Sequence, residues 1–501
     1  MSYNKDKSIA FRSFLAVLLF VGFYILGLGI AAALLYVPFI DIGGGSFHVR
    51  ADFFCVIGAF IIVISLVPRR NKFEQPGPLL QEAEHPRLFA EIRKVAELTG
   101  QVMPKEVYLI SQVNAWVSQY GGFLGFKTKR IMGLGLTLLQ ILDISELRAI
   151  LAHEFGHYYG GDTKLAPLVY RTRSTIERTL SGLSNHSSML QKPFQVYGNL
   201  FLRVTHSVSR AQEFAADKLA VSIAGSEKFI SGLTKIHAAS EAFDPYWKNE
   251  LAPVLSSGFL PPVADGFRMF IKAQKISDGL AEKIQSELEN PISNKYDTHP
   301  PFKNRIDSVK DIHTIVQDNA NNVMAITLME SVQFVEKQLL IFIADKKSVE
   351  SLKPIEWNEA AEKVYIPYWE AVMQGQTIGL KDITPLDIPK VARDVSSFAE
   401  GLKINKNEQI SHAALANKVI GSALAFILHN KGWSVETFPG ESVYFKHDGL
   451  SMDPFNVLTD LSSGKLTEAD WDEICRNAGI ENINIGRVAV GGFQRDEEFE
   501  A

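Results

Sequence analysis

Apolar residues gather in two long runs near the N-terminus, and charged residues interrupt every later run. Residues 11–40, FRSFLAVLLFVGFYILGLGIAAALLYVPFI, carry one charge, Arg12, at their edge. This run exceeds the roughly 20 apolar residues that a membrane-spanning helix needs. It is also far longer than the roughly 7–15-residue apolar core of a cleaved signal peptide, which is the competing interpretation. We therefore predict a transmembrane helix here.

A second apolar run covers residues 53–67, FFCVIGAFIIVISLV, and is short for a membrane-spanning helix. Taken alone, it could be a buried helix or a re-entrant segment. A short glycine-rich loop, residues 41–52, separates it from the first run, which favours a second span and a helical hairpin. We find no later stretch of about 18 apolar residues free of charge, so we expect no further span.

Basic residues flank this hairpin and are rare in its loop. In chain order they are Lys5, Lys7, Arg12, Arg50, Arg69, Arg70 and Lys72. Only Arg50 lies in the loop. Because cytoplasmic flanks of membrane spans carry an excess of Lys and Arg, both ends of the hairpin are predicted to be cytoplasmic. Everything after Lys72 would then face the cytoplasm.

The rest of the chain mixes helical and alternating patterns, which predicts an α+β fold, mostly helical with a small mixed sheet. We divide the chain into a membrane anchor (1–72), a middle domain (73–313) and a C-terminal α+β region (314–501). In the middle domain we expect a helix at 86–98, strands at 106–110, 114–118 and 130–137, and a helix at 207–224 stopped by Gly225. In the C-terminal region we expect helices at 323–344, 357–373 and 412–430 and a hairpin at 435–446.

Composition excludes some classes of protein. A chain of 501 residues exceeds what one hydrophobic core usually organises, so two or three domains are expected. The formal net charge of -5 and the pI near 6.2 show no basic excess, which argues against nucleic acid as a partner. Cys55 and Cys475 are the only cysteines and form no CxxC pair. A disulfide framework or a cysteine-built zinc site is therefore not expected.

One predicted helix carries a metal-binding pattern. It begins near Asp143 or Ser145, because Asp143 and Glu146 have the spacing of a capping box, and it contains HEFGH at residues 153–157. Residues four apart share one helix face, so His153 and His157 can both bind one zinc ion. Glu154 projects beside them and can activate the attacking water. The alternative is an ordinary helix that happens to hold two histidines.

A catalytic zinc needs a third protein ligand and an open position. The segment SRAQEFAAD, residues 209–217, places Glu213 and Asp217 on one helix face. Glu213 can bind the metal while Asp217 accepts a hydrogen bond from the outer nitrogen of a zinc-bound imidazole. A solvated acidic pair is the alternative, which the preceding HExxH helix disfavours. We expect one Zn²⁺ per chain.

Three signatures occur in a fixed order, namely ELRAILAHEFGHYYGGD, SRAQEFAAD and DTHPPFKNR. Together they resemble the membrane gluzincins that include the heat-shock protease HtpX and the CAAX prenyl endopeptidases, over roughly residues 72–313. The resemblance implies a zincin-like metallopeptidase domain. It assigns His153, His157 and Glu213 as zinc ligands and Glu154 as the catalytic base. It also implies a bacterial inner (cell) membrane, peptide or protein substrates, contact with membrane lipid, and a role in membrane-protein quality control.

Four further residues take roles from this resemblance. Asn114 and Ala115 resemble the edge strand on which these peptidases align substrate; an internal strand at 113–117 is the alternative. His299 and Arg305 match positions that face the active site, where a cationic donor can stabilise the oxyanion. Without the resemblance, His299 would be a turn residue before two prolines.

The sequence also departs from this family. Its members carry spanning helices between the HExxH helix and the third-ligand helix, whereas residues 161–206 here hold many charges, namely Lys164, Arg171, Arg173, Glu177, Arg178, Lys192 and Arg203. Residues 194–204 are expected to lie on the membrane surface or to form an amphipathic helix packed on the domain. From residue 314 onward the chain resembles no family, and no oligomeric state is indicated.

The function that these patterns predict is zinc-dependent endopeptidase activity in a membrane-anchored protein. One alternative is an intramembrane metalloprotease, although Arg148, Asp162 and Lys164 flank the motif and disfavour a membrane-embedded HExxH helix. Another is a membrane-tethered interaction protein that keeps a peptidase fold without turnover. The presence of Glu154 disfavours that class, because a scaffold needs no catalytic base.

Overall fold

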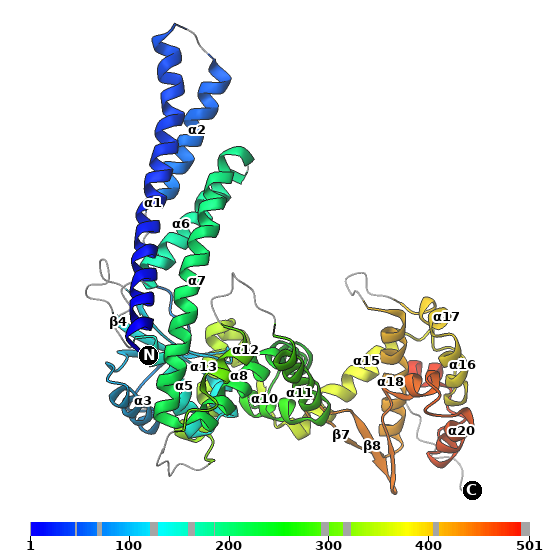
Figure 1. Ribbon diagram of the computed structural model, residues 1–501. Helices are drawn as coiled ribbons and strands as arrows, with labels where there is room; N and C mark the ends of the chain where they lie inside the picture. The colour runs from blue at the N-terminus through cyan, green and yellow to red at the C-terminus, as the bar shows by residue number, and fades with distance from the viewer. Residues whose placement is uncertain are drawn as a thin grey trace, which may run out of the picture. The chain divides into compact units, whose positions relative to one another are not determined.

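The chain folds into two compact units (Figure 1). The computed structural model describes residues 2–45, 48–67, 73–120, 129–158, 166–184, 186–291, 300–313, 322–403 and 410–491. The first unit contains Met1–Ser240 and Ala281–Ile343, and the second contains Glu241–Leu280 and Ala344–Ala501. The division of the chain at residues 72 and 313 stays a prediction.

The N-terminal apolar runs form a helical hairpin, which confirms that part of the predicted fold. Helix α1 covers Ser2–Gly43 and helix α2 covers Val49–Leu66. In the described part of the chain, Phe14–Gly43 and Val49–Leu66 are the helices long and apolar enough to span a membrane, with mean hydropathies of 2.5 and 2.2. Only 22% and 33% of these stretches are buried. Their exposed apolar surface is what a bilayer would cover.

Two later helices pack against this hairpin. Helix α6 covers Ala166–Ser184 and helix α7 covers Ser188–Ala224. Phe194 and Phe201 of α7 are fully buried with Phe23 of α1 and Ile62 of α2. The rings of Phe23 and Phe194 meet edge to face, with centroids 6.0 Å apart. Residues 194–204 therefore form a packed amphipathic stretch of one long helix (Figure 1).

A mixed four-stranded sheet lies before the HExxH helix. Its strands are β1 (Leu79–Leu80), β2 (Glu106–Ile110), β3 (Ala115–Tyr120) and β4 (Lys129–Gly135), in the order β1-β2-β4-β3. Strands β2 and β4 are parallel, and β3 pairs antiparallel with β4, with Val117 opposite Met132. Gly133 makes room for the pairing, since an added Cβ would lie 2.3 Å from the Trp116 ring. Strand β3 is thus an edge strand.

Helices complete the first unit around this sheet. They are α3 (Pro86–Leu98), α4 (Leu136–Ile141), α5 (Ile144–Gly156), α8 (Ser226–Tyr246), α11 (Gln274–Glu289), α12 (Phe302–Val309), a 3₁₀ turn (Ala325–Leu328) and α13 (Val332–Ile343). Residues of α8 and α11 contribute to both units. Helix α7 ends at Ala224 before Gly225, which has φ +86° and stops the helix as predicted. The predicted helix at 323–344 is interrupted, since Ser331 has φ +50° between the 3₁₀ turn and α13.

The second unit is built around one long buried helix, α18 (His412–Asn430). Its other elements are a π-helical turn (Trp247–Leu251), α9 (Ala252–Ser256), β5 (Phe259–Leu260), α10 (Val263–Lys272), α14 (Lys346–Glu350), β6 (Lys353–Pro354), two turns (Trp357–Glu359, Ala361–Tyr365), α15 (Ile366–Gly375), a 3₁₀ turn (Pro385–Asp387), α16 (Ile388–Arg393), α17 (Val395–Glu400), β7 (Ser434–Glu436), β8 (Tyr444–His447), β9 (Leu450–Met452), α19 (Val457–Ser462), α20 (Glu468–Asn477) and α21 (Ile485–Gly491). The predicted helix 412–430 and hairpin 435–446 are confirmed. The predicted helix 357–373 is helical throughout, as a 3₁₀ turn, a π-helical turn and then α15, where Pro367 has no N–H for a regular α-helical bond.

Candidate active site

Helix α5 begins with two buried carboxylates that fix its position. Asp143 accepts a hydrogen bond from the Glu146 backbone (2.7 Å), and Glu146 accepts one from the Asp143 backbone (2.9 Å), which makes a capping box. Lys228 lies 2.7 Å from Asp143, and Lys235 lies 2.7 Å from Glu146. Both lysines belong to α8, so ion pairs hold α5 against that helix. The described part of α5 ends at Gly156, with His157 as its C-cap.

Gly156 allows the third-ligand helix to approach. A Cβ added at Gly156 would lie 2.8 Å from Cα and 2.9 Å from Cβ of Ala216 on α7, too close for any side chain. The two helices therefore pack with almost no separation at this point. Figure 1 shows α5 and α7 side by side. As a result Glu213 of α7, three residues before Ala216, reaches the histidines of α5.

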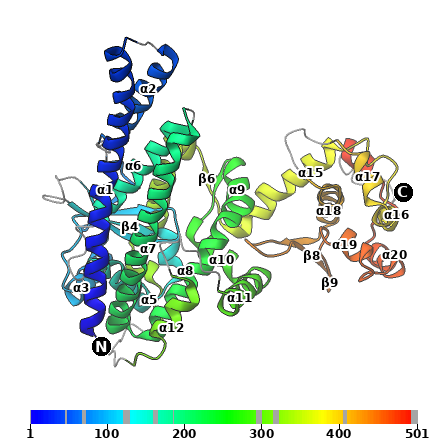
Figure 2. The ribbon, with the colours of Figure 1, turned by 45° about the horizontal axis from the view of Figure 1, so that its top comes forward.

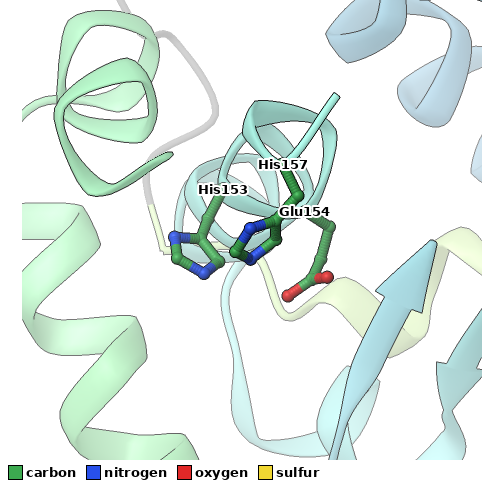
Figure 3. A group of neighbouring side chains, drawn as sticks. All are labelled: His153, Glu154 and His157. Carbon is green, nitrogen blue, oxygen red and sulfur yellow. The ribbon is translucent and has the colours of Figure 1, made fainter. Parts of the chain in front are cut away.

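Both histidines lie beside the Glu213 carboxylate, each near a different oxygen; candidate metal ligands cluster as His153, Glu154 and His157 and as His153, Glu213 and Asp217. Nε2 of His153 lies 3.5 Å from Glu213 Oε2, and Nε2 of His157 lies 3.6 Å from Glu213 Oε1. Tetrahedral zinc with bonds of about 2.0–2.1 Å places its ligand atoms roughly 3.4 Å apart. Figure 3 shows the imidazoles of His153 and His157 side by side, with the Glu154 carboxylate next to them. The donor atoms therefore have the chemistry and spacing that a zinc ion requires.

Asp217 and Arg305 lie behind this group. Oδ1 of Asp217 is 2.9 Å from Nδ1 of His153. Arg305, from α12, donates two hydrogen bonds to Asp217, of 3.0 Å from Nε and 2.6 Å from Nη2. Its Nη2 also lies 3.4 Å from Nε2 of His153. Figure 2 shows α12 beside α7, and this packing carries the guanidinium into the site. His299, the other residue of that signature with a predicted role, lies outside the described residues.

Burial and neighbouring charges shift the pKa values of the site. Burial raises the pKa of Glu154 to about 7, although His153 lowers it. Burial lowers the pKa of His153, but hydrogen bonds to Asp217 and Glu213 outweigh it and raise that pKa to about 9. Burial and the charge of His153 lower the pKa of His157 to about 4.

The two carboxylates on α7, Glu213 and Asp217, have lowered pKa values although burial alone would raise them. Burial raises the pKa of Glu213, but the hydrogen bond and charge of His153 outweigh this and lower the pKa to about 2. Asp217 behaves in the same way, with Arg305 adding to the effect of His153, and its pKa is lowered. Glu213 and Asp217 therefore stay ionised, and the site favours a positive charge beside them.

The edge strand β3 contacts the catalytic end of α5. The Val117 carbonyl accepts a hydrogen bond of 2.9 Å from the hydroxyl of Tyr158, and a backbone hydrogen bond from Val117 also reaches Glu154. The guanidinium carbon of Arg130 lies 4.4 Å from the centre of the Tyr158 ring. Asn114 faces β4 instead, since its carbonyl accepts from Gly135 at 2.8 Å. Ala115 is buried at the start of the strand.

Sequence reasoning missed Tyr158 and the role of Gly156. Both lie inside the signature that was used, HEFGHYYGGD. A signal for Gly156 was available, because a glycine in a helix interior costs stability and usually has a packing reason. Tyr158 gave no such signal, because its partner Val117 is 41 residues away in the sequence.

The fold and the site define a class of protein, a metallopeptidase with an HExxH helix and a glutamate on a second helix. Comparison with known proteins agrees. Residues 82–313 match the model of peptidase family M48. These residues are thus similar to a peptidase family M48 domain, and the predicted resemblance to HtpX-like membrane metallopeptidases is confirmed.

Several curated proteins are similar to this chain. The HtpX protease homologue of Archaeoglobus fulgidus is 26% identical over 237 residues, covering 45% of this chain and 68% of that protein. The protease HtpX of Acinetobacter baylyi is 25% identical over 240 residues, covering 43% and 77%. That of Chromohalobacter salexigens is 22% identical over 304 residues, covering 55% and 89%. No solved structure gives a significant match to the chain. The matches support a membrane-associated metalloprotease.

Proposed function

We propose that this protein is a membrane-anchored zinc endopeptidase that binds one zinc ion through His153, His157 and Glu213. The observation that carries the proposal is the convergence of these three side chains, with 3.5 Å and 3.6 Å between the imidazole nitrogens and the glutamate oxygens. When bound, zinc would supply Lewis acidity to the scissile carbonyl and would lower the pKa of water toward about 7. Asp217, on Nδ1 of His153, would fix the tautomer that leaves Nε2 free for the metal.

Glu154 is the proposed general base. It projects from the same helix as the two histidines, and burial raises its pKa to about 7. A base with a pKa near the working pH can both take a proton from water and return it. We propose that Glu154 takes the proton of the attacking water and delivers it to the leaving nitrogen.

The edge strand β3 is the proposed surface for substrate alignment, with Asn114 and Ala115 as its binding residues. Backbone groups alternate along a strand, and those of Val117 point away from β4 toward α5. Ala115, two residues earlier, is expected to share that orientation, and we propose that the backbone at this end of the strand pairs with an extended peptide. Asn114 positions this end of the strand through its bond to Gly135.

Arg305 is the proposed oxyanion donor. Its guanidinium is fixed on Asp217 and lies 3.4 Å from Nε2 of His153, where it adds positive charge beside the reacting carbonyl. A catalytic role for His299 stays a prediction from its sequence signature.

We further propose that the protein is an integral protein of the bacterial inner membrane with its peptidase site in the cytoplasm. The hairpin of α1 and α2 and the basic residues around it support this orientation. Peptides or proteins would be the substrates, in keeping with the HtpX proteases to which the chain is similar. A part in membrane-protein quality control follows from that proposal.

The test is the variant Glu154→Gln, measured for both zinc content and peptide hydrolysis. Gln keeps the shape of the side chain but cannot accept a proton from water. We expect zinc binding to be retained and hydrolysis to fall by about 10²–10⁴-fold. Undiminished hydrolysis in a zinc-loaded Glu154→Gln protein would contradict the proposed mechanism. His237→Ala, which changes a histidine of α8 outside the site, is the matched control and should hydrolyse peptide normally.

A further inference from the structure

A cavity of about 500 Å³ lies between α2 and α6, away from the active site. One wall is apolar and consists of α2 residues, namely Phe60, Ile61, Ile64 and Ser65. The other wall is polar and consists of α6 residues, namely Ser174, Glu177, Arg178, Ser181 and Gly182. Phe60 and Ile64 remain 64% and 45% exposed, so the apolar wall is open to its surroundings. The cavity is therefore amphipathic and accessible.

Arg178 is the central polar group of this cavity. Its Nη2 donates a hydrogen bond of 2.9 Å to Thr175 on the preceding turn of α6. Its Nε is buried and has no hydrogen-bond partner among the residues that the structure describes. A buried N–H of a guanidinium that lacks an acceptor is costly, and an anionic oxygen is the acceptor it binds best. Glu177 adds one negative charge to the same wall; it is exposed and lies 3.4 Å from Arg173 on the preceding turn.

The cavity lies near one end of α2, which places it close to a membrane surface if α2 spans the bilayer. Helix α2 has 18 residues, which make a length of about 27 Å, close to the roughly 30 Å thickness of a bilayer core. The cavity is lined by residues 60–65, in the last two turns before the helix ends at Leu66. Gly182 keeps α6 close to this end, since an added Cβ would lie 2.9 Å from Ile61. When α2 spans the bilayer, these residues lie at the edge of the hydrocarbon core, next to the lipid headgroups.

We propose that this cavity binds one phosphatidylethanolamine molecule. The phosphate accepts the hydrogen bond of Arg178 Nε, the primary ammonium lies against Glu177, and an acyl chain covers Phe60 and Ile64. Charge complementarity selects this lipid, because the polar wall carries one cation and one anion and this headgroup carries both opposite charges. The proposal rests on the membrane insertion of α2 and is independent of catalysis.

The test is lipid binding by the purified full-length protein in detergent, measured by native mass spectrometry with added phosphatidylethanolamine or phosphatidylglycerol. We expect the wild type to retain one phosphatidylethanolamine about tenfold more tightly than phosphatidylglycerol, and Arg178→Gln to lose this preference. Arg203→Gln is the matched control, because Arg203 is an exposed arginine on α7 that does not line the cavity. It should bind lipid as the wild type does. Inorganic phosphate should not displace the lipid.

A cavity-filling variant and a separate hydrolysis assay distinguish lipid binding from other effects. Ser181→Phe fills the cavity while both arginines remain, and it should also lose the bound lipid. Equal retention in Arg178→Gln and Arg203→Gln, or a wild type that holds phosphatidylglycerol at least as tightly, would overturn the proposal. Displacement by inorganic phosphate would overturn it too, since it would identify a free anion site. Hydrolysis of a soluble peptide is measured separately, so loss of the proposed peptidase function would leave the lipid result unaffected.

Discussion

Two buried helices, α5 in the first unit and α18 in the second, use burial in opposite ways. Helix α5 buries Glu146, Arg148 and His153 among its apolar residues. Helix α18 buries only apolar or small residues, and Ser422 is the single buried hydroxyl along it. Most residues of both helices are buried, although Glu154 of α5 is only partly so. Helix α18 is a core element, while α5 places charges where water cannot screen them.

The buried charges of α5 are stable because each has a partner. Arg148 lies 2.6 Å from Glu91, and Glu146 accepts hydrogen bonds from Ser231 (2.6 Å) and Lys235 (2.7 Å). Unpaired buried charges would be strongly destabilising. Glu154 is different, since burial raises its pKa to about 7. A buried carboxylate whose pKa approaches neutrality marks functional chemistry more often than structure.

The largest expected effect is on metal binding. His153→Ala removes one of three zinc ligands, so the purified protein should fall from about one zinc ion per chain to almost none. Asp217→Asn leaves the three ligands but weakens the support of His153, and zinc affinity should fall about 10–100-fold. Atomic absorption and competition with a chelator measure both. Normal zinc content in His153→Ala would exclude the proposed site, and His237→Ala should bind zinc normally.

A substitution in α18 should affect stability alone. Leu424 is fully buried in the core of the second unit, and Leu424→Ala should lower the free energy of unfolding by about 2–5 kcal/mol. Ser422→Ala is the matched change on the same helix. It should cost less than about 1 kcal/mol, because the buried Ser422 hydroxyl has no hydrogen-bond partner to lose. Denaturant unfolding followed by circular dichroism distinguishes them, and equal losses would contradict this account of α18.

Much of this contrast could be predicted from the sequence, but only where the signal is local. The apolar runs, the capping box and the HExxH spacing are local patterns. They correctly predicted the membrane hairpin and helix α5. The approach of α7 to α5 depends on Gly156 and Ala216, which are 60 residues apart in the sequence, so no periodicity indicates it. The same holds for Tyr158 and Val117. The predicted helix 357–373 is helical in the structure, but its first half is a 3₁₀ turn and a π-helical turn, and nothing local in the sequence indicates that change of helix type.

Gly156→Ala tests the close packing of α5 and α7. The added methyl group would lie 2.8 Å from the Ala216 backbone, so α7 must shift. We expect a loss of about 1–3 kcal/mol in the free energy of unfolding, together with weaker zinc binding because Glu213 moves with α7. Gly279→Ala in α11 is the matched control. Its Cβ would meet nothing within 4 Å, so the better helix propensity of Ala should stabilise the protein slightly. Unchanged zinc affinity in Gly156→Ala would contradict the packing argument.

The smallest expected effect is a pH-dependent gain in stability when the catalytic base is removed. Burial raises the pKa of Glu154 from 4.5 to about 7 in the folded protein. Between these values the folded state binds more protons than the unfolded state. The contribution of Glu154 to the free energy of unfolding is therefore fully present below pH 4.5 and is lost as the pH rises through about 7.

Glu154→Gln should remove the loss of stability that the Glu154 carboxyl causes as the pH rises. In chelator-treated, metal-free protein, the variant should be more stable than the wild type at pH 8, by about 1–3 kcal/mol. Below pH 4.5 the difference should disappear, because the wild-type carboxyl is then neutral in both states. Glu177→Gln, which changes an exposed carboxylate of α6, should alter stability by less than about 0.5 kcal/mol at either pH. Urea unfolding of all three proteins at both pH values measures the effect. If Glu154→Gln raised the free energy of unfolding equally at both pH values, the buried charge of Glu154 would not be the cause. Helix α5 would then use burial as α18 does.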